Sequence, residues 1–293
     1  MLGAIIGDVT GSRFEWHNLK SKEFELLTDK CFMTDDSYMT IAVADALMNR
    51  NDNDADLSAK TIASMQRIGR RYPDCGFGGR FFGWVFDDDP QPYHSYGNGA
   101  AMRISACGYM AETLDEAKQL ALAVTRISHD HPEGLKAAEA ETVAIFMALH
   151  GASMEEIRKV ITEEYYPIDF TLDEIRESYQ FDVSSQGTLP QAFEAFFEST
   201  GFEDAIRNAI SIGGDSDTLA AITGGIAEAY WGIPEELKKK ILTYIDDEEL
   251  LGIVIAFEGA DDIIHRERYA RTSTKILPED PGRRGMAAEE YGS

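Results

Sequence analysis

Residues 213–232 read GGDSDTLAAITGGIAEAYWG, in which two glycines and two acids precede a long run of small apolar residues. Gly213 and Gly214 accept positive φ angles without a steric penalty, so they permit a tight turn. We expect a helix to begin after this turn, near Asp217. The small residues that follow predict that this helix is packed closely and deeply; they are Ala220, Ala221, Gly224, Gly225 and Ala227.

The two acids of this stretch, Asp215 and Asp217, are separated by one residue. Inside a helix that spacing turns the two side chains about 200° apart, whereas in a turn both point the same way. A second acidic pair, Asp35 and Asp36, lies in MTDDSYMT (33–40), immediately before the apolar run IAVADAL. Around a helix N-terminus both of these side chains can face one cavity. Two separate segments thus each offer a hydroxyl and two carboxylates at the start of an apolar helix.

Two interpretations of these acidic clusters are open. Helix capping favours Asp, Ser and Thr at N-termini, where they accept hydrogen bonds from free N–H groups and suit the helix dipole. A cap needs only one or two such residues, however, and burying four uncompensated carboxylates costs several kcal/mol for each ion. Carboxylates and hydroxyls without cysteine or paired histidine suit hard cations such as Mg²⁺ or Mn²⁺ rather than zinc. The spacing favours a divalent metal site, with capping and solvation as the alternative.

Helical signals dominate the rest of the chain, and runs of alternating β-branched residues are almost absent, so we expect an all-α fold. Serine or threonine followed three residues later by glutamate is typical of a capped helix start. This pattern occurs at Thr113–Glu116, Ser153–Glu156, Thr171–Glu174 and Thr200–Glu203. Proline favours the first helical position, and glycine favours the residue after a helix. We therefore expect helix starts at Pro190 and Pro234, and helix ends at Gly151, Gly201 and Gly232.

Two regions depart from this helical pattern. Residues 75–99 are too rich in Gly and Pro for a regular element and too aromatic for a disordered linker, which predicts an ordered loop. Beyond about Arg266 the composition becomes polar. We expect one domain over residues 1–266 and a polar, loosely held C-terminal tail over residues 267–293.

The chain of 293 residues carries 52 acidic and 27 basic side chains, a formal net charge of −25. A field of that sign repels nucleic-acid phosphates and anionic lipid heads, so we expect neither nucleic acid nor a membrane as a partner. No stretch approaches ~18 uninterrupted apolar residues, and the N-terminus lacks the pattern of a signal peptide. Three widely spaced cysteines without a CxxC pair argue against a disulfide or zinc framework. The sequence therefore predicts a cytoplasmic protein, which we expect to be a monomer.

Three further segments carry polar or glycine-rich patterns. GAIIGDVTGSRFE (3–15) spaces its glycines four apart, as in a helix face that packs on another helix, with Glu15 just beyond and within reach of a polar cavity. SYGNGAAMR (95–103) is a glycine-rich turn that either presents N–H groups to phosphate or merely starts a helix. For the histidines of SHDHP, His129 and His131, ordinary surface positions are the alternative to a ligand role.

Taken together and in this order, the segments resemble the ADP-ribosylglycohydrolase family over about residues 1–265. The pairing of TDD with GGDSDT at this separation is highly specific, and the glycine-rich segments agree with it. The resemblance implies a compact, orthogonal, all-α multi-helix domain with a binuclear Mg²⁺ or Mn²⁺ centre at the mouth of a central cleft. The segments that carry it are GAIIGDVTGSRFE (3–15), MTDDS (33–37), SYGNGAAMR (95–103), SHDHPEG (128–134) and GGDSDTLAAITGGIAEAYWG (213–232).

Carried over residue by residue, the resemblance implies site roles. The metal ligands would be Thr34, Asp35, Asp36, Asp215, Asp217 and Thr218. The diphosphate and distal part of ADP-ribose would contact Ser95, Tyr96, Gly97, Asn98 and Gly99, with His129 on the ligand side. Glu15 would lie near the ribose and the metals, and Glu15 and Asp36 are the candidate catalytic residues. Ser37 stands where the family often has threonine, and Val9-Thr10 where an Ala-Leu pair is common; neither change removes a ligand.

The implied reaction is hydrolysis of the N-glycosidic bond between ADP-ribose and a protein side chain, with arginine as the expected linkage. The alternatives are hydrolysis of a serine-linked or O-acetyl conjugate of ADP-ribose, or a non-catalytic ADP-ribose-binding protein. Four aromatic residues of the 75–99 segment either stack on adenine or anchor the segment to the core; they are Phe77, Phe81, Phe82 and Trp84.

Overall fold

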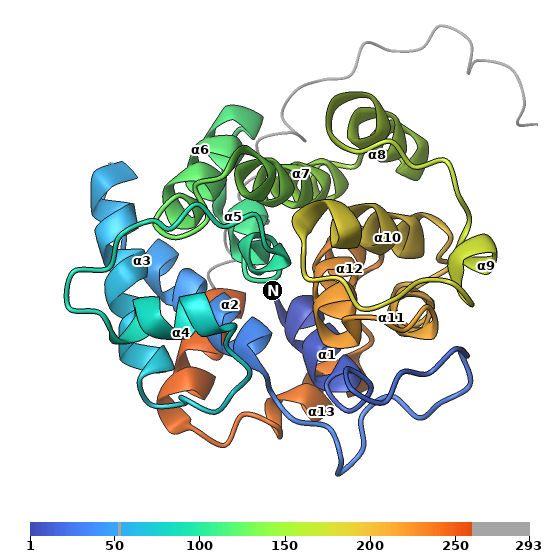
Figure 1. Ribbon diagram of the computed structural model, residues 1–293, viewed down its shortest axis with the longest axis horizontal. Coiled ribbons are helices and arrows are strands. Elements are labelled where there is room, and N and C mark those ends of the chain that lie inside the picture. Colours follow the sequence, from blue (N-terminus) through green and yellow to red (C-terminus); the bar gives the residue numbers. More distant parts are fainter. Residues whose placement is uncertain (52–53, 260–293) are drawn as a thin grey trace, which may run out of the picture.

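The computed structural model describes residues 1–51 and 54–259. These residues form helices and no strand, which confirms the expected all-α fold (Figure 1). The helices of the first half are α1 (Leu2–Gly11), α2 (Asp35–Met48), α3 (Asp54–Gly69), α4 (Gly79–Phe86), the 3-10 helix η1 (Asn98–Ala100), α5 (Ser105–Met110), α6 (Leu114–Thr125) and α7 (Pro132–Leu149). Those of the second half are α8 (Met154–Val160), the π-helix η2 (Ile161–Tyr165), α9 (Leu172–Ile175), α10 (Ser185–Phe197), α11 (Phe202–Ser211), α12 (Ser216–Trp231) and α13 (Glu235–Leu242). A further helix covers residues 248–259.

Two expectations fall at the C-terminal end of the chain. The expected domain boundary at residue 266 and the expected tail over residues 267–293 lie outside the described residues. Among the helices that are described, none combines the length and the apolar character that a membrane crossing requires.

Helices α1 and α12 pack closely against each other in antiparallel orientation (Figure 1). A Cβ atom on Gly7 would lie 1.9 Å from the Ala220 carbonyl oxygen, and one on Gly11 would lie 2.5 Å from the Asp217 Cα atom. Both distances are far inside van der Waals contact, so only glycine permits this approach. The glycine face expected for residues 3–15 is confirmed. The contact also brings the end of α1 to the start of α12.

Helix α12 is the central element of the fold. Helices α1, α7, α10 and α11 pack around it, and every residue from Ser216 to Ala227 is buried. A helix that is apolar or small on all faces belongs in a core, which confirms the deep packing expected from its small residues. Helix α2 packs against α1, α3 and α5. This arrangement places the N-terminal ends of α2 and α12 next to each other.

The starts of these two helices agree with the sequence-based expectation. Gly213 and Gly214 have φ angles of 67° and 75°, and α12 begins two residues later at Ser216. Helix α2 begins at Asp35, and the Thr34 hydroxyl caps it by accepting a hydrogen bond from the backbone N–H of Asp36. Complete capping boxes form at Ser153–Glu156 and Thr171–Glu174, whereas at Thr113–Glu116 only the hydroxyl half of the box is present.

Three local predictions were wrong. Residues 79–86 of the expected loop form helix α4, because Phe81, Trp84 and Val85 fall on one face and are buried together, which outweighs the glycine content. Pro190 does not start a helix; it lies inside α10, which Ser184 caps five residues earlier than expected.

The third error concerns the start of α11. Gly201 does not end a helix but is the N-cap of α11, and the Thr200 hydroxyl bonds Asp204 rather than Glu203. Pro234 also occupies an N-cap, one residue before the helical position expected for it, while Gly151 and Gly232 follow helix ends with positive φ as expected.

Candidate active site

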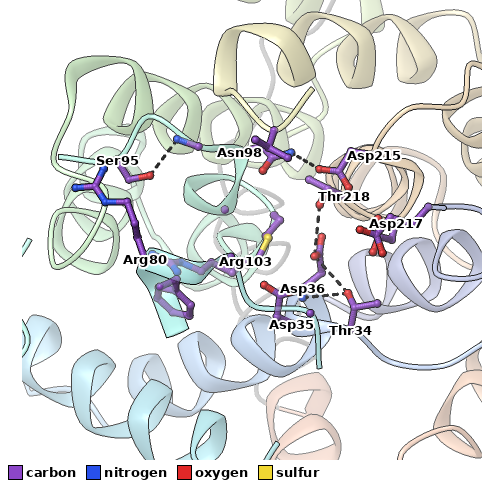
Figure 2. A pocket seen from close by; sticks show the side chains of 18 of the residues that line it. Thr34, Asp35, Asp36, Arg80, Ser95, Asn98, Arg103, Asp215, Asp217 and Thr218 are labelled. Carbon is purple, nitrogen blue, oxygen red and sulfur yellow. Dashed lines mark hydrogen bonds between the residues drawn. The ribbon is translucent and has the colours of Figure 1, made fainter. Parts of the chain in front are cut away.

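A cavity of about 510 Å³ opens where the N-terminal ends of α2 and α12 meet (Figure 2). It is lined by all but one of the expected site residues, namely Glu15, Thr34, Asp35, Asp36, Ser95, Gly97, Asn98, Gly99, His129, Asp215, Asp217 and Thr218. Tyr96 is the exception, because its side chain is 51% exposed and packs against His131 outside the lining. Segments far apart in sequence therefore converge on one cavity.

Asp8 organises the α2 side of this cavity and was missed by the sequence analysis. Its Oδ1 accepts a hydrogen bond from the Thr34 hydroxyl at 2.7 Å, and its Oδ2 accepts bonds from the backbone N–H groups of Thr34 and Ser37 at 3.0 and 3.1 Å. The Ser37 hydroxyl also donates to Oδ2. Complete burial raises the pKa of Asp8 to about 6 despite these donors. A single acid in a helix whose other residues are apolar, glycine or threonine was the available signal.

Asp36 lies between the two helix starts. Its side chain is 2% exposed, and its Oδ2 is 3.4 Å from the hydroxyls of Thr34 and Thr218, so residues of both helices meet at this oxygen. Its Oδ1 is buried and has no hydrogen-bond partner among the described residues. Burial, followed by the charge of Asp217, raises the pKa of Asp36 well above its usual range. One oxygen of this buried carboxylate therefore has no donor among the described residues.

The α12 side repeats this arrangement. Asp215 Oδ2 accepts a hydrogen bond from the Asn98 amide at 2.7 Å, whereas Asp217 Oδ1 is buried without a partner among the described residues. Burial, followed by the charge of Asp215, raises the pKa of Asp217 well above its usual range. Burial, followed by the charge of Asp217, raises the pKa of Glu15 to about 7.

The acidic side chains form two clusters of three carboxylates each, and Asp217 belongs to both. Asp8, Asp36 and Asp217 bring one oxygen each to within 4.8 Å of one another, and Glu15, Asp215 and Asp217 do the same. Like charges this close, buried, and lacking donors on two oxygens require a cation or shared protons. Oxygen-only donor sets of this kind fit hard divalent cations. The residues present therefore suit a divalent metal.

Asp35 lines the same cavity but belongs to neither cluster. Its backbone N–H donates to the Cys75 carbonyl at 3.0 Å, and burial together with the Asp217 charge raises the pKa of Asp35 to about 8. Its role as a metal ligand stays a prediction.

The side of the cavity away from Asp217 carries a buried cation, Arg103 (Figure 2). Arg103 is 1% exposed and donates to the Ser128 hydroxyl at 2.7 Å, with its guanidinium 5.0 Å from the centre of the Phe81 ring. Its Nε and one terminal nitrogen are buried without a hydrogen-bond partner, and no carboxylate among the described residues lies within ion-pair distance of it. Arg103 is the last residue of the SYGNGAAMR segment (95–103), and no role was predicted for it from the sequence.

His129 is buried beside Arg103, so its surface alternative was wrong. Its ring is 4% exposed, and burial, followed by the Arg103 charge, lowers the pKa of His129 well below its usual range. Its Nδ1 lies 2.9 Å from the Ser128 hydroxyl. A Cβ atom on Gly99 would lie 3.2 Å from its Nε2. His131 instead caps α7 by accepting a hydrogen bond from the Glu133 backbone N–H.

The glycine-rich loop is held against the segment before α10. The backbone N–H of Asn98 donates to the Val183 carbonyl at 2.8 Å, and the N–H of Gly97 donates to the Ser95 hydroxyl at 3.2 Å. These two groups are thus already bonded within the protein. In the preceding segment, Phe81 and Trp84 stack on each other and are buried, and the Trp84 indole donates to the Ile127 carbonyl, so both anchor the segment to the core.

The sequence model of the ADP-ribosylglycohydrolase family matches residues 1–270 of the chain. The chain belongs to the ADP-ribosylglycohydrolase family. Mouse ADP-ribosylhydrolase ARH3 is 24% identical over 80% of this chain and 83% of its own length. ADP-ribosylarginine hydrolase Tri1 of Pseudomonas putida strain GB-1 is 24% identical over 82% of this chain and 72% of its own length.

A solved structure titled as an ADP-ribosylglycohydrolase-related protein complex shares the fold. It superimposes with a TM-score of 0.66 at 24% sequence identity, and the match covers 87% of this chain and 94% of that one. The ADP-ribosylglycohydrolase fold and family are therefore established, and family membership supports hydrolase chemistry in the cavity described above.

Proposed function

We propose that this protein hydrolyses the N-glycosidic bond between ADP-ribose and an arginine side chain of a modified protein. The observation that carries the proposal is the polarity of the cavity, because the buried acids Asp36 and Asp217 and the Arg103 guanidinium lie on different sides of it (Figure 2). ADP-ribose has a matching polarity, because its anionic diphosphate is several bonds away from the anomeric carbon. A volume of about 510 Å³ suits a ligand of this size.

The carboxylate side is proposed to bind two divalent cations, Mg²⁺ or Mn²⁺. This assignment is supported by the two carboxylate clusters that have Asp217 in common. It is also supported by one oxygen each of Asp36 and Asp217 that has no hydrogen-bond partner among the described residues. The ligands are assigned as Thr34, Asp35, Asp36, Asp215, Asp217 and Thr218, with Asp8 holding the first of these in place. Bound cations supply positive charge that orients ribose hydroxyls and makes water more acidic.

Proton transfer is assigned to Glu15 in preference to Asp36. Both residues line the cavity, but Glu15 is half-buried, whereas Asp36 is almost fully buried and faces the hydroxyls of Thr34 and Thr218. A carboxylate oxygen of Glu15 accepts a proton from the water that attacks the anomeric carbon. The bond from that carbon to the guanidine nitrogen breaks through an oxocarbenium-like transition state, and the proton passes to the departing nitrogen. The products are ADP-ribose and unmodified arginine.

The diphosphate is assigned to the Arg103 side of the cavity. Because the N–H groups of Gly97 and Asn98 are bonded within the protein, the charge of the Arg103 guanidinium in the cavity wall supplies the main attraction, with Ser95 in the same lining. A buried cation of this kind attracts phosphate strongly in a low-dielectric cavity. This local charge explains how a chain with a net charge of −25 binds an anionic nucleotide.

The test is release of ADP-ribose from three substrates: an arginine-ADP-ribosylated protein, a serine-ADP-ribosylated peptide and O-acetyl-ADP-ribose, each with Mg²⁺. The proposal predicts preferential release from the arginine linkage. Preferential release from either of the other two substrates would replace arginine as the linkage. No release from any of them would refute the enzyme assignment and favour a binding protein.

A further inference from the structure

Two aromatic side chains are exposed at the rim of the cavity. Trp16 is 73% exposed and Phe181 is 42% exposed, yet their rings stack on each other with centroids 5.2 Å apart and planes inclined by 23°. Both line the cavity, as does the neighbouring Val183, which is 55% exposed. The pair comes from segments more than 160 residues apart, the loop after α1 and the loop before α10. Large apolar side chains exposed together around a cavity are typical of a binding surface.

Both segments are fixed by specific polar contacts. The Asn18 side chain donates to the Gly214 carbonyl at 2.9 Å and accepts from the Gly214 N–H at 2.8 Å, which ties the Trp16 segment to the turn before α12. The Lys20 ammonium donates to the carbonyls of Tyr179 and Ile212, which ties the same segment to the Phe181 loop. The aromatic pair is therefore held in place before any ligand arrives.

The position of the pair identifies the part of the ligand that it meets. Trp16 follows Glu15 directly in the sequence, and both residues line the cavity. Glu15 forms a cluster of carboxylates with Asp215 and Asp217, and the bond to be broken would lie beside this cluster. The Arg103 side of the cavity is assigned to the diphosphate. The rim beside Glu15 is thus the side from which the modified protein side chain enters.

Building on the proposed function, we propose that Trp16 and Phe181 form the surface that receives the guanidinium of the ADP-ribosylated arginine and selects arginine over serine linkages. A substituted guanidinium is a planar cation that stacks on aromatic faces and is attracted by their electrons. The nearby carboxylates add to this attraction. A serine linkage offers neither a plane nor a charge, so it gains nothing from the rim. Trp16 and Phe181 are specificity-determining residues and take no part in bond breaking.

The experiment compares the full-length wild-type protein with Trp16→Ala and Trp16→Phe. Phe86→Ala serves as the control, because Phe86 is also 42% exposed and does not line the cavity. Steady-state kinetics are measured on arginine-linked and serine-linked ADP-ribosyl peptides of the same sequence context, and the affinity for free ADP-ribose is measured by calorimetry. For Trp16→Ala we expect KM for the arginine-linked peptide to rise about three- to thirtyfold, the range of a cation–π contact. Trp16→Phe should retain most of the wild-type value, and Phe86→Ala all of it.

The other measurements separate this inference from the proposed function. Affinity for free ADP-ribose and kcat/KM for the serine-linked peptide should change less than about twofold in Trp16→Ala, because neither ligand uses the rim. An unchanged KM for the arginine-linked peptide, or an equal loss on all three ligands, would overturn the inference and leave the proposed function standing. A wild-type protein inactive on the arginine-linked peptide would refute the proposed function first, and this inference with it.

Discussion

Replacing Asp217 with asparagine should stabilise the metal-free protein while abolishing its response to metal. Asp217 belongs to both carboxylate clusters and is 4% exposed. Within each cluster, one oxygen of every member lies within 4.8 Å of those of the other two. Two unit charges at that distance repel by roughly 3.5 kcal/mol at an effective dielectric constant of about 20. Shared protons relieve part of this repulsion in the metal-free protein, so we expect a net gain of about 2 kcal/mol. For a chain of this length that gain corresponds to an increase in Tm of roughly 3 °C.

The assay is thermal unfolding in chelator and in excess Mg²⁺. The wild-type protein should gain about 2.7 kcal/mol when Mg²⁺ is present at one hundred times its dissociation constant, and Asp217→Asn should gain almost nothing. Asp169→Asn, which removes an exposed carboxylate, should behave like the wild type in both conditions. The reasoning is refuted if Asp217→Asn lowers Tm in chelator, or if its Tm rises with Mg²⁺ as much as that of the wild type.

Three further predictions follow from packing, charge and burial. Gly7→Ala should lower the free energy of unfolding in urea by at least about 2 kcal/mol, because its Cβ would meet the Ala220 carbonyl at 1.9 Å; wild-type stability would contradict the packing of α1 on α12. Arg103→Met should weaken calorimetric binding of ADP-ribose about tenfold or more with an unchanged circular dichroism spectrum, whereas undiminished binding would remove Arg103 from the diphosphate site. Burial raises the pKa of Glu141 well above its usual 4.5, so its stabilising contribution is complete below about pH 4.5 and is lost as pH rises toward the folded-state pKa. Relative to the wild type, Glu141→Gln should therefore become more stable by up to about 1.4 kcal/mol for each pH unit in that range. The prediction is wrong if urea unfolding gives the same free-energy difference between the two proteins at pH 5 and at pH 7.

Local patterns in the sequence predicted much of the fold. The glycines of residues 3–15 and the small residues of α12 predicted a close helix pair, because only such residues let two helix backbones approach so far. Reading glycine content as a sign of a loop failed for α4. There, burial of Phe81 and Trp84 against the core outweighed the poor helix propensity of glycine, and burial of that kind depends on what the rest of the chain supplies.

The candidate site was predictable where its chemistry lies in short segments, as at Asp36 and Asp217. Asp8 was missed because its role depends on Thr34 and Ser37, which reach it only after α1 and α2 have packed. Arg103 was missed for a related reason. Its buried nitrogens become significant only once the fold shows that no carboxylate of the described residues lies within ion-pair distance. Interactions across the fold therefore decide the residues that sequence patterns leave unassigned.

The central claim is that the inward-facing carboxylates hold divalent cations for hydrolysis of an arginine–ADP-ribose bond. The most direct test measures ADP-ribose released from an arginine-ADP-ribosylated peptide after chelation and then after re-addition of Mg²⁺ or Mn²⁺, with Asp217→Asn in parallel. The account predicts no release in chelator, recovery of release and of the unmodified arginine peptide when metal is restored, and no recovery in Asp217→Asn. Release that persists in chelator, or that Asp217→Asn recovers as fully as the wild type, would contradict it.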